Sequence, residues 1–441
     1  MIQTKHKTLF EFDYIGKQIA ENIAVVPDSV YDWLKKQCLS VNEESRWIKL
    51  SSKSGQEVIQ FVGYVGVLRA PCGYQLEILP KTGKSNDGKI EETRGLLIHM
   101  LQCMREFRHY KTPDAALEKV KMPLLEVFIQ QFLLCVESVV RRGLRSDYIA
   151  EQDNLFALRG KLLWSQHIKQ NLVRKDRFFT EHDEFSSNRA ENRLLHLALH
   201  QVIKISQSAG NQKLARELRF VFNDIPLSLD IAKDFQRVRL DRGMAYYEPA
   251  LDWAKLLLLD ESPLTGLGNT DAISLIFPMA ALFEAYVAKH LRKQLKENHY
   301  LKEQVSSKSL VTHAPQEEKQ KWFKLKPDLL IYQGEITQPK LILDTKWKLL
   351  DIAKNNGTDK YDLSQADFYQ LFAYGHLYYT QQSERQLVLI YPMTESFDKA
   401  LPVFIFNDNL SLWVLPFCLN SKKLLFDNTG LNTVFKYDIK K

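Results

Sequence analysis

Cysteine is scarce in this chain, and its few copies are not grouped. Five cysteines occur among 441 residues, and no two of them form a C-x-x-C pair. The odd number, the scatter and the missing spacing favour reduced thiols in a cytoplasmic protein over a disulfide framework. The five are Cys38, Cys72, Cys103, Cys135 and Cys418.

Long hydrophobic runs are missing as well. No stretch approaches the length of a membrane span without a charge, and the first residues, MIQTKHKTLFEF, lack the apolar run of a signal peptide. We therefore expect a soluble intracellular protein with no membrane partner.

A complete phosphate-binding loop is also absent. Gly83-Lys84-Ser85 matches the end of the Walker pattern, but Ile78 stands where the pattern requires its first glycine. The surrounding TGKSNDGK is better interpreted as a polar turn. We expect no NTP binding by this chain itself.

The composition is that of an ordinary globular chain. With 45% hydrophobic and 26% charged residues, 441 residues suffice for two or three domains with ample cores. The formal charge of +7 and the pI near 8.9 are compatible with a polyanionic partner but do not require one.

The pattern of apolar residues predicts a multidomain α+β protein. Residues 1–110 are expected to form a β-rich domain with partner docking as one role, including a hairpin that turns at Pro71-Cys72-Gly73. Residues 111–260 are expected to be a helical middle region, with helix ends at Gly143 and Gly210. The Pro- and Gly-containing run from Asp260 to Asp271 is the predicted boundary before a C-terminal α/β domain, residues 270–441.

A basic and aromatic stretch lies inside the middle region. Its composition suits contact with phosphates or with a protein partner, and a charged rim over a helical core is an equally good interpretation. The residues concerned are Arg159, Lys161, Arg174, Lys175 and Arg177, interleaved with Phe156, Trp164 and Phe178.

Two predicted strands near residue 340 carry charged residues at regular positions. The runs LKPDLLIY and KLILDTKWKL are rich in Leu, Ile and Trp, with a turn expected at Gln333-Gly334. Because strand side chains alternate, Asp344 and Lys346 emerge on one face, and Asp328 stands on the preceding strand. Such carboxylates can hold a hard divalent cation, and the ammonium can orient a water or neutralise phosphate charge.

Two predicted helices flank these strands. In IFPMAALFEAYVAKHL the apolar rhythm places Glu284 on the shoulder of the buried face. In SQADFYQLFAYGHLY, Gln370 and Tyr374 share one face at i and i+4. The order of Glu, P-D, D-x-K and Q-x-x-x-Y resembles the PD-(D/E)xK restriction-endonuclease-like core, in its RecB-like branch.

The resemblance narrows when upstream blocks are included. VGYVGVLRAPCGYQLEILPK, YIAEQDNLFALRGKLL, DEFSSNRAENRLL and LILDTKWK together resemble the McrC family, whose members are nuclease subunits of McrBC-type modification-dependent restriction systems. The resemblance implies a subunit that docks on an AAA+ GTPase motor, the McrB-like partner. It also implies that the complex cuts DNA that carries modified bases of the methylcytosine type. It implies Mg²⁺, one or two ions, held by Asp328 and Asp344 with Glu284. Lys346 is the third catalytic residue, and Gln370 and Tyr374 are supports.

Two other functions stay open on the sequence. One is a non-catalytic scaffold that activates the motor, although the intact pattern of Asp328, Asp344 and Lys346 argues against a decayed site. The other is a stand-alone RecB-like nuclease. An iron–sulfur form of that nuclease needs four cysteines around the core, and only Cys418 lies in the predicted C-terminal domain.

Overall fold

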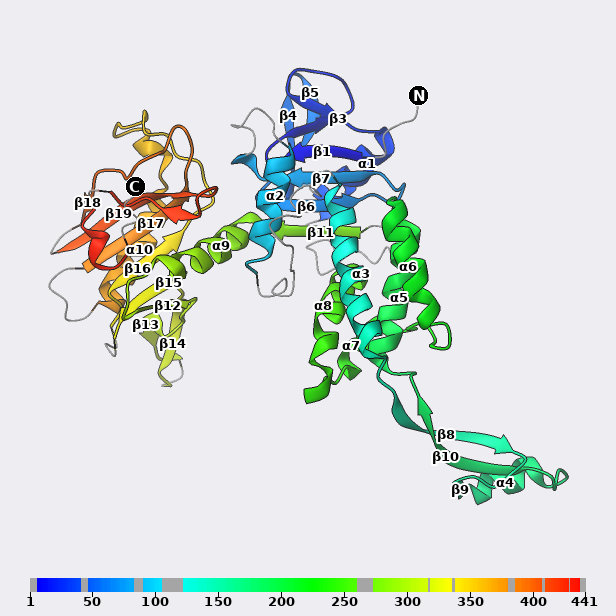
Figure 1. Ribbon diagram of the computed structural model, residues 1–441. Coiled ribbons are helices and arrows are strands. Elements are labelled where there is room, and N and C mark those ends of the chain that lie inside the picture. Colours follow the sequence, from blue (N-terminus) through cyan, green and yellow to red (C-terminus); the bar gives the residue numbers. More distant parts are fainter. Residues whose placement is uncertain are drawn as a thin grey trace. The chain divides into compact units, whose positions relative to one another are not determined.

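The computed structural model divides into two compact units (Figure 1). The first unit comprises Met1–Gly66, Leu76–Val120 and Ile276–Lys441, and the second comprises Val67–Gln75 and Lys121–Leu275. No helix in the described stretches is both long and apolar enough to span a membrane. The structure describes residues 6–40, 47–82, 90–104, 122–259, 273–315, 318–334, 338–379, 385–406, 409–427 and 429–436. The predicted boundary at Asp260–Asp271 and the Gly83-Lys84-Ser85 turn lie outside these residues.

The strands of residues 6–79 form two four-stranded sheets, of order β3-β2-β5-β4 and, with the later strand β11, of order β1-β7-β6-β11. A stacked pair of buried rings, Trp47 and Phe61, has centroids 5.8 Å apart, and a buried ion pair joins Glu77 to Arg94 at 2.6 Å. The predicted turn at residues 71–73 joins the neighbouring strands β6 and β7. The elements are β1(His6–Phe10), β2(Tyr14–Gly16), β3(Ile23–Val25), α1(Asp28–Ser40), β4(Ile48–Lys53), β5(Gln56–Phe61), β6(Tyr64–Arg69), β7(Gln75–Leu79), α2(Ile90–Leu101) and β11(Ile273–Pro278).

The C-terminal part of the first unit is built on a seven-stranded sheet of order β12-β15-β16-β17-β19-β18, with β20 beside β19. Strand β16 is central: it pairs antiparallel with β15 and parallel with β17. The strands are β12(His299–Glu303), β15(Leu329–Gln333), β16(Leu341–Thr345), β17(Arg385–Pro392), β18(Phe404–Ile405), β19(Leu410–Cys418) and β20(Lys423–Leu424), and short 3-10 turns lie at η8(Lys360–Asp362) and η9(Leu431–Thr433).

Two helices cover this sheet. Helix α9(Met279–Gln294) packs Phe283 against Trp347 and Phe417, with ring centroids 5.3 and 6.3 Å apart. Helix α10(Gln365–Tyr378) lies in the crossover between the parallel strands β16 and β17 and buries Leu371 and Tyr374 in a cluster that also contains sheet residues. The chain therefore has the mixed α/β character that its sequence predicted.

A glycine sets how closely α10 lies on the sheet. A Cβ atom at Gly375 would stand 2.9 Å from both terminal methyls of Leu410, which is itself buried, and 3.4 Å from a methyl of Leu387. Glycine therefore lets α10 lie this close to the sheet without a shift of Leu410.

A two-stranded ribbon separates β12 from β15. It consists of β13(Lys308–His313) and β14(Gln320–Leu325), paired antiparallel, and its strands belong to no larger sheet in the described part of the chain. Figure 1 shows the ribbon extending away from the sheet of β12, β15 and β16. No strand is predicted from the sequence for these residues.

The second unit is a helical bundle with a β-rich arm. Glu126 on the first helix of the bundle ties the helices together: its carboxylate accepts hydrogen bonds from the Ser206 hydroxyl at 2.8 Å and from Asn211 Nδ2 at 2.7 Å. Gly143 ends this helix with φ 91°, as predicted, whereas Gly210 lies inside a helix and ends none. The bundle elements are α3(Leu124–Arg142), α5(Ala190–Ile205), α6(Ala209–Val221), α7(Ile231–Arg237), η5(Arg242–Tyr247) and α8(Glu248–Leu258).

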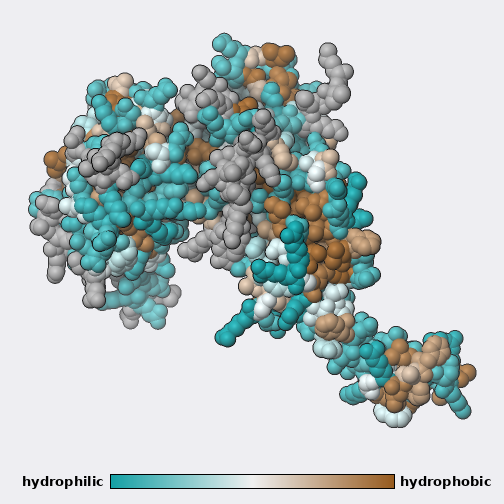
Figure 2. Space-filling model, in the orientation of Figure 1, coloured by the Kyte–Doolittle hydropathy of each residue, from teal (hydrophilic) through white to brown (hydrophobic). Residues whose placement is uncertain are grey.

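The basic and aromatic stretch of the sequence forms the arm, so its prediction as part of a helical region was wrong. Here β8(Asp147–Leu155) and β10(Phe178–Ser186) pair along their whole length, with β9(Lys161–Leu162) and α4(Trp164–Asn171) between them in sequence. Polar residues alternate irregularly in these strands, which concealed the strand period. Figure 2 shows hydrophobic residues on the surface of this arm. Its exposed large apolar residues are Tyr148, Phe156, Leu158, Trp164, Ile168, Leu172, Val173 and Phe185.

Candidate functional site

Asp344 lies in the middle of the C-terminal sheet. It belongs to the central strand β16. Asp344 is two residues after Ile342, so the two side chains lie on the same face of the sheet, the face covered by α10. The residue is 1% exposed, which is rare for a carboxylate. A carboxylate at such a position needs a charged or metal partner to offset its desolvation.

Asp328 precedes β15 and is fixed by the end of the neighbouring strand. Its Oδ2 atom accepts a hydrogen bond from the Thr345 backbone N–H at 2.7 Å and another from the Thr345 hydroxyl at 2.8 Å. Because β15 and β16 are adjacent, the two acidic residues of the sequence pattern come to the same end of the sheet.

Lys346 follows directly after β16 and is surrounded by oxygen atoms. Its Nζ lies 2.7 Å from Asp344 Oδ2 and 3.7 Å from Asp367 Oδ1, and it donates a hydrogen bond to Gln370 Oε1 at 3.1 Å. Three groups from a strand and a helix therefore orient one ammonium.

Gln370 and Tyr374 continue this hydrogen-bonded chain along α10. Gln370 Nε2 donates to the Tyr374 hydroxyl at 2.7 Å, and that hydroxyl donates to the Lys326 carbonyl at 3.2 Å. The amide thus binds the lysine with its oxygen and the tyrosine with its nitrogen, which fixes the side-chain orientation of Gln370.

Glu284 approaches from helix α9. Its Oε1 atom accepts a hydrogen bond from Gln304 Nε2 at 2.9 Å, and the backbone N–H of Gln304 donates to the Asp328 carbonyl at 2.8 Å. Glu284 is thereby linked through Gln304 to the chain segment of Asp328.

The carboxylates of this region influence one another. Burial raises the pKa of Asp344 to about 7, and the charge of Asp328 acts in the same direction, against the lowering effect of Lys346. Burial likewise raises the pKa of Glu284 to about 7, again with Asp328 as the next cause. The site therefore carries more negative charge than its protein neighbours offset.

The two donors of the site keep their protons near neutral pH. Burial acts to lower the pKa of Lys346, but the charges of Asp344 and Asp367 outweigh it, and the pKa lies above its usual value. Burial raises the pKa of the Tyr374 hydroxyl to about 12. A lysine that stays charged is suited to stabilising negative charge, not to removing a proton from water.

The donor chemistry fits a hard divalent cation. Asp344 Oδ2 is buried and receives no regular hydrogen bond from the described residues, although the ammonium of Lys346 is its ion-pair partner. Carboxylate oxygens such as those of Asp328, Asp344 and Glu284 are what Mg²⁺ prefers. In the described part of the chain, no three His, Cys, Asp or Glu side chains are already gathered as a metal cluster.

Two further residues of this region have no role predicted from the sequence. One is Thr345, which holds Asp328 through a contact across the strand end that no sequence pattern signals. Asp367 lies three residues before Gln370 and so on the same helix face, a spacing that predicts its position. Tyr391 in turn donates to Asp367 Oδ2 at 3.2 Å.

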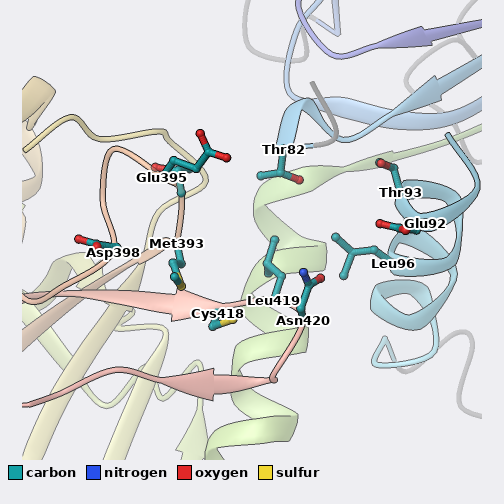
Figure 3. Close-up of a pocket in the computed structure, with 11 residues that line it drawn as sticks. Thr82, Glu92, Thr93, Leu96, Met393, Glu395, Asp398, Cys418, Leu419 and Asn420 are labelled. Carbon is teal, nitrogen blue, oxygen red and sulfur yellow. The ribbon is translucent and has the colours of Figure 1, made fainter. Parts of the chain in front are cut away.

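A cavity of about 490 Å³ lies elsewhere in the first unit (Figure 3). It contains none of the residues described above. Its charged side chains are acidic, the same sign as nucleic acid, so we place no DNA site there. The lining residues are Thr82, Glu92, Thr93, Leu96, Met393, Thr394, Glu395, Asp398, Cys418, Leu419 and Asn420.

Comparison with solved structures gives similar folds. The chain is similar to McrC in a half-complex from a tetradecameric assembly of Thermococcus gammatolerans McrB AAA+ hexamers with bound McrC. The TM-score is 0.65 at 21% identity, and the match covers 96% of this chain and 97% of that one. A cryo-EM structure of the Thermococcus gammatolerans McrBC complex matches 65% of this chain and 87% of that one, with a TM-score of 0.47 and 24% identity.

Comparison by sequence gives the family. No curated protein matches the chain. The sequence profile described as "McrBC 5-methylcytosine restriction system component" matches residues 59–392, which is more than half of the chain. The resemblance found in the sequence is thereby confirmed, and the chain belongs to the family of McrBC 5-methylcytosine restriction system components.

Proposed function

We propose that this chain is the Mg²⁺-dependent DNA endonuclease subunit of a modification-dependent restriction complex, acting with an AAA+ GTPase partner. The observation that carries the proposal is the position of Lys346, whose ammonium lies between Asp344, Asp367 and Gln370 and is also influenced by the charge of Asp328. Several carboxylates that can bind a metal ion, next to one oriented ammonium, suit hydrolysis of a phosphodiester.

Each residue has a distinct task in this proposal. Asp328, Asp344 and Glu284 would hold the metal, which supplies a water of lowered pKa and polarises the scissile phosphate. Lys346 positions the attacking water and stabilises the negative charge that accumulates on the phosphate in the transition state. Gln370 and Asp367 also contact Lys346, so they would keep its ammonium in place if Asp344 held the cation.

The partner is proposed from the family and from the arm of the second unit. In the similar Thermococcus structure, McrC is bound to McrB AAA+ hexamers. The arm exposes large apolar side chains, among them Phe156 at 69% and Trp164 at 67%. Exposed apolar residues that gather on one segment indicate a protein interface and suit phosphates poorly. We therefore assign motor docking to this arm and not to residues 1–110.

Plasmid cleavage tests the proposal. Methylated and unmethylated plasmids are incubated with the full chain and Mg²⁺, with and without its AAA+ partner and GTP. Asp344→Asn is run in parallel, with Asp398→Asn as a control that removes one exposed carboxylate from the same unit. We expect cleavage of methylated DNA only with partner and GTP, lost in Asp344→Asn and kept in Asp398→Asn.

The other outcomes identify the alternative functions. Cleavage by the chain alone would indicate a stand-alone nuclease. Stimulated GTP hydrolysis without any cleavage would indicate a scaffold. Normal cleavage by Asp344→Asn would show that the site has been placed wrongly.

A further inference from the structure

The ribbon of β13 and β14 is exposed on both of its faces. Its residues are almost all exposed, including Leu310, Val311 and Trp322, and Phe323 is 69% exposed. Two-stranded ribbons of this kind are only marginally stable in water unless something packs on them. The ribbon therefore has a surface available for a partner.

The charge of the ribbon selects the kind of partner. Five lysines lie on it or at its ends, whereas Glu318 is its one described acidic residue. None of these lysines makes an ion pair within the described part of the chain, so their charge is available to a ligand. They are Lys308, Lys319, Lys321, Lys324 and Lys326.

The register distributes this charge over the ribbon. Lys321 is paired with Thr312, and Lys324 is paired with Ser309. Phe323 stands between the two lysines with a left-handed backbone, so regular strand alternation does not relate their side chains. Trp322 lies between them and packs edge-on against His313, with ring centroids 4.5 Å apart.

Both ends of the ribbon are hydrogen-bonded to α10, the helix that carries Gln370 and Tyr374. The Tyr378 hydroxyl donates to the Val305 carbonyl at 3.0 Å and to the Leu325 carbonyl at 3.4 Å. One helical turn earlier, Tyr374 donates to the Lys326 carbonyl while it accepts from Gln370. The ribbon thus leaves the sheet beside Gln304 and returns to it two residues before Asp328.

Phe323 is held in an unusual backbone conformation. Its φ is 56°, in the left-handed region that bulky side chains rarely adopt. Strained, exposed residues of this type are concentrated at binding and switch sites. The Phe323 ring is exposed to solvent despite this unfavourable backbone conformation, so it is available to contact a sugar or a base.

We propose that the β13–β14 ribbon is a DNA-docking arm that binds the phosphate backbone of duplex DNA and leads the duplex to the site of Asp344 and Lys346. The inference rests on the proposed nuclease function and adds the surface that holds its substrate. A two-stranded ribbon fits the major groove of B-DNA, where the lysines along it would reach the backbone phosphates.

Salt-dependent DNA binding tests the inference. A labelled duplex is titrated with the complex of full chain and AAA+ partner, carrying Asp344→Asn so that the DNA is not cut. The double variant Lys321→Glu, Lys324→Glu is compared with Lys340→Glu, Lys399→Glu, which makes the same charge change on exposed lysines of the same unit away from the ribbon. Because each lost phosphate contact lowers the slope of log affinity against log salt by about 0.9, we expect a slope smaller by roughly 2 in the ribbon variant only.

The remaining outcomes separate this inference from the proposed function. Equal slopes in both double variants would overturn it. Loss of partner-stimulated GTP hydrolysis with an unchanged slope would also overturn it, because the ribbon would then contact the motor. If the double variant does not fold, the single changes Lys321→Gln and Lys324→Gln are expected to lower the slope by about 1 each. Failure of the unaltered complex to bind or cut DNA would refute the nuclease proposal instead.

Discussion

The Asp328 carboxylate is held by Thr345 through two hydrogen bonds to one oxygen, from the backbone N–H at 2.7 Å and from the hydroxyl at 2.8 Å. Thr345 belongs to β16 and stands between Asp344 and Lys346 in sequence. The strand that carries the buried aspartate therefore also orients the second one, and leaves Asp328 Oδ1 for other interactions.

Thr345→Val removes the hydroxyl while keeping the shape and the backbone N–H. A hydrogen bond to a charged group contributes about 1.5–3 kcal/mol, so we expect the cleavage rate at fixed Mg²⁺ to fall by about tenfold or more. More Mg²⁺ should be needed for half-maximal rate, as measured by a metal titration of plasmid cleavage. Thr345→Ser should restore most of the rate; if Val and Ser behave alike, the hydroxyl has no orienting role.

Two tyrosines of α10 allow a matched comparison. Tyr374→Phe breaks the chain from Gln370 to the Lys326 carbonyl and loosens Lys346, so we expect kcat for DNA cleavage to fall by about tenfold. Tyr378→Phe removes the bonds to the ribbon and should chiefly raise KM. Steady-state cleavage kinetics give both constants, and identical effects of the two changes would contradict these separate roles.

The raised pKa of Glu284 predicts a pH-dependent stability in the absence of metal. Burial, with Asp328 as the next cause, raises this pKa from 4.5 in the unfolded chain to about 7 in the folded one. As pH rises between these values, the unfolded chain loses its proton first, so folding stability falls until the folded pKa is passed. Stability is therefore fully present below the unfolded pKa and is lost through about pH 7.

Glu284→Gln removes the ionisable carboxyl group and with it the loss of folding stability at high pH. The variant should match the parent protein at low pH and unfold at a higher urea concentration than the parent above neutral pH, both without metal. Glu297→Gln, which removes an exposed carboxylate nearby in the chain, is the control. A difference between parent and Glu284→Gln that does not change with pH would contradict the assignment.

The arm of the second unit gives a prediction about partner binding. Trp164→Ala truncates a large exposed aromatic residue, and loss of such an anchor weakens a protein interface by about 2 kcal/mol or more, roughly thirtyfold. Phe220→Ala removes another exposed aromatic residue, 75% exposed, outside the arm. Stimulation of the partner's GTP hydrolysis, titrated against chain concentration, should be shifted by Trp164→Ala alone.

Phe323→Gly should separate stability from DNA binding. The left-handed backbone strains a phenylalanine by about 1–3 kcal/mol and a glycine hardly at all, which offsets the greater entropy loss of glycine on folding. We expect unchanged or slightly higher thermal stability together with weaker DNA binding. Weaker binding and lower stability together would indicate a purely structural role for the ring.

The sequence predicted the parts of the site that depend on regular periods. Alternation in β16 placed Asp344 and Lys346 together, and the i, i+4 spacing paired Gln370 with Tyr374. The contacts of Asp328 with Thr345 and of Glu284 with Gln304 join strand ends and a helix that are separate in sequence, and no local pattern encodes them. The ribbon escaped prediction because its exposed apolar residues come in adjacent pairs, Leu310-Val311 and Trp322-Phe323, so no apolar alternation marks its strands.

The close approach at Gly375 has a consequence for finding related sites by sequence. A glycine inside a helix costs about 1 kcal/mol relative to alanine, so its presence directly after Tyr374 is explained by the 2.9 Å clearance to Leu410 and not by helix formation. A search pattern for chains that hold their lysine in this way should therefore extend from Q-x-x-x-Y to Q-x-x-x-Y-G. In a chain with any other residue there, either the leucine that faces it or α10 would have to shift.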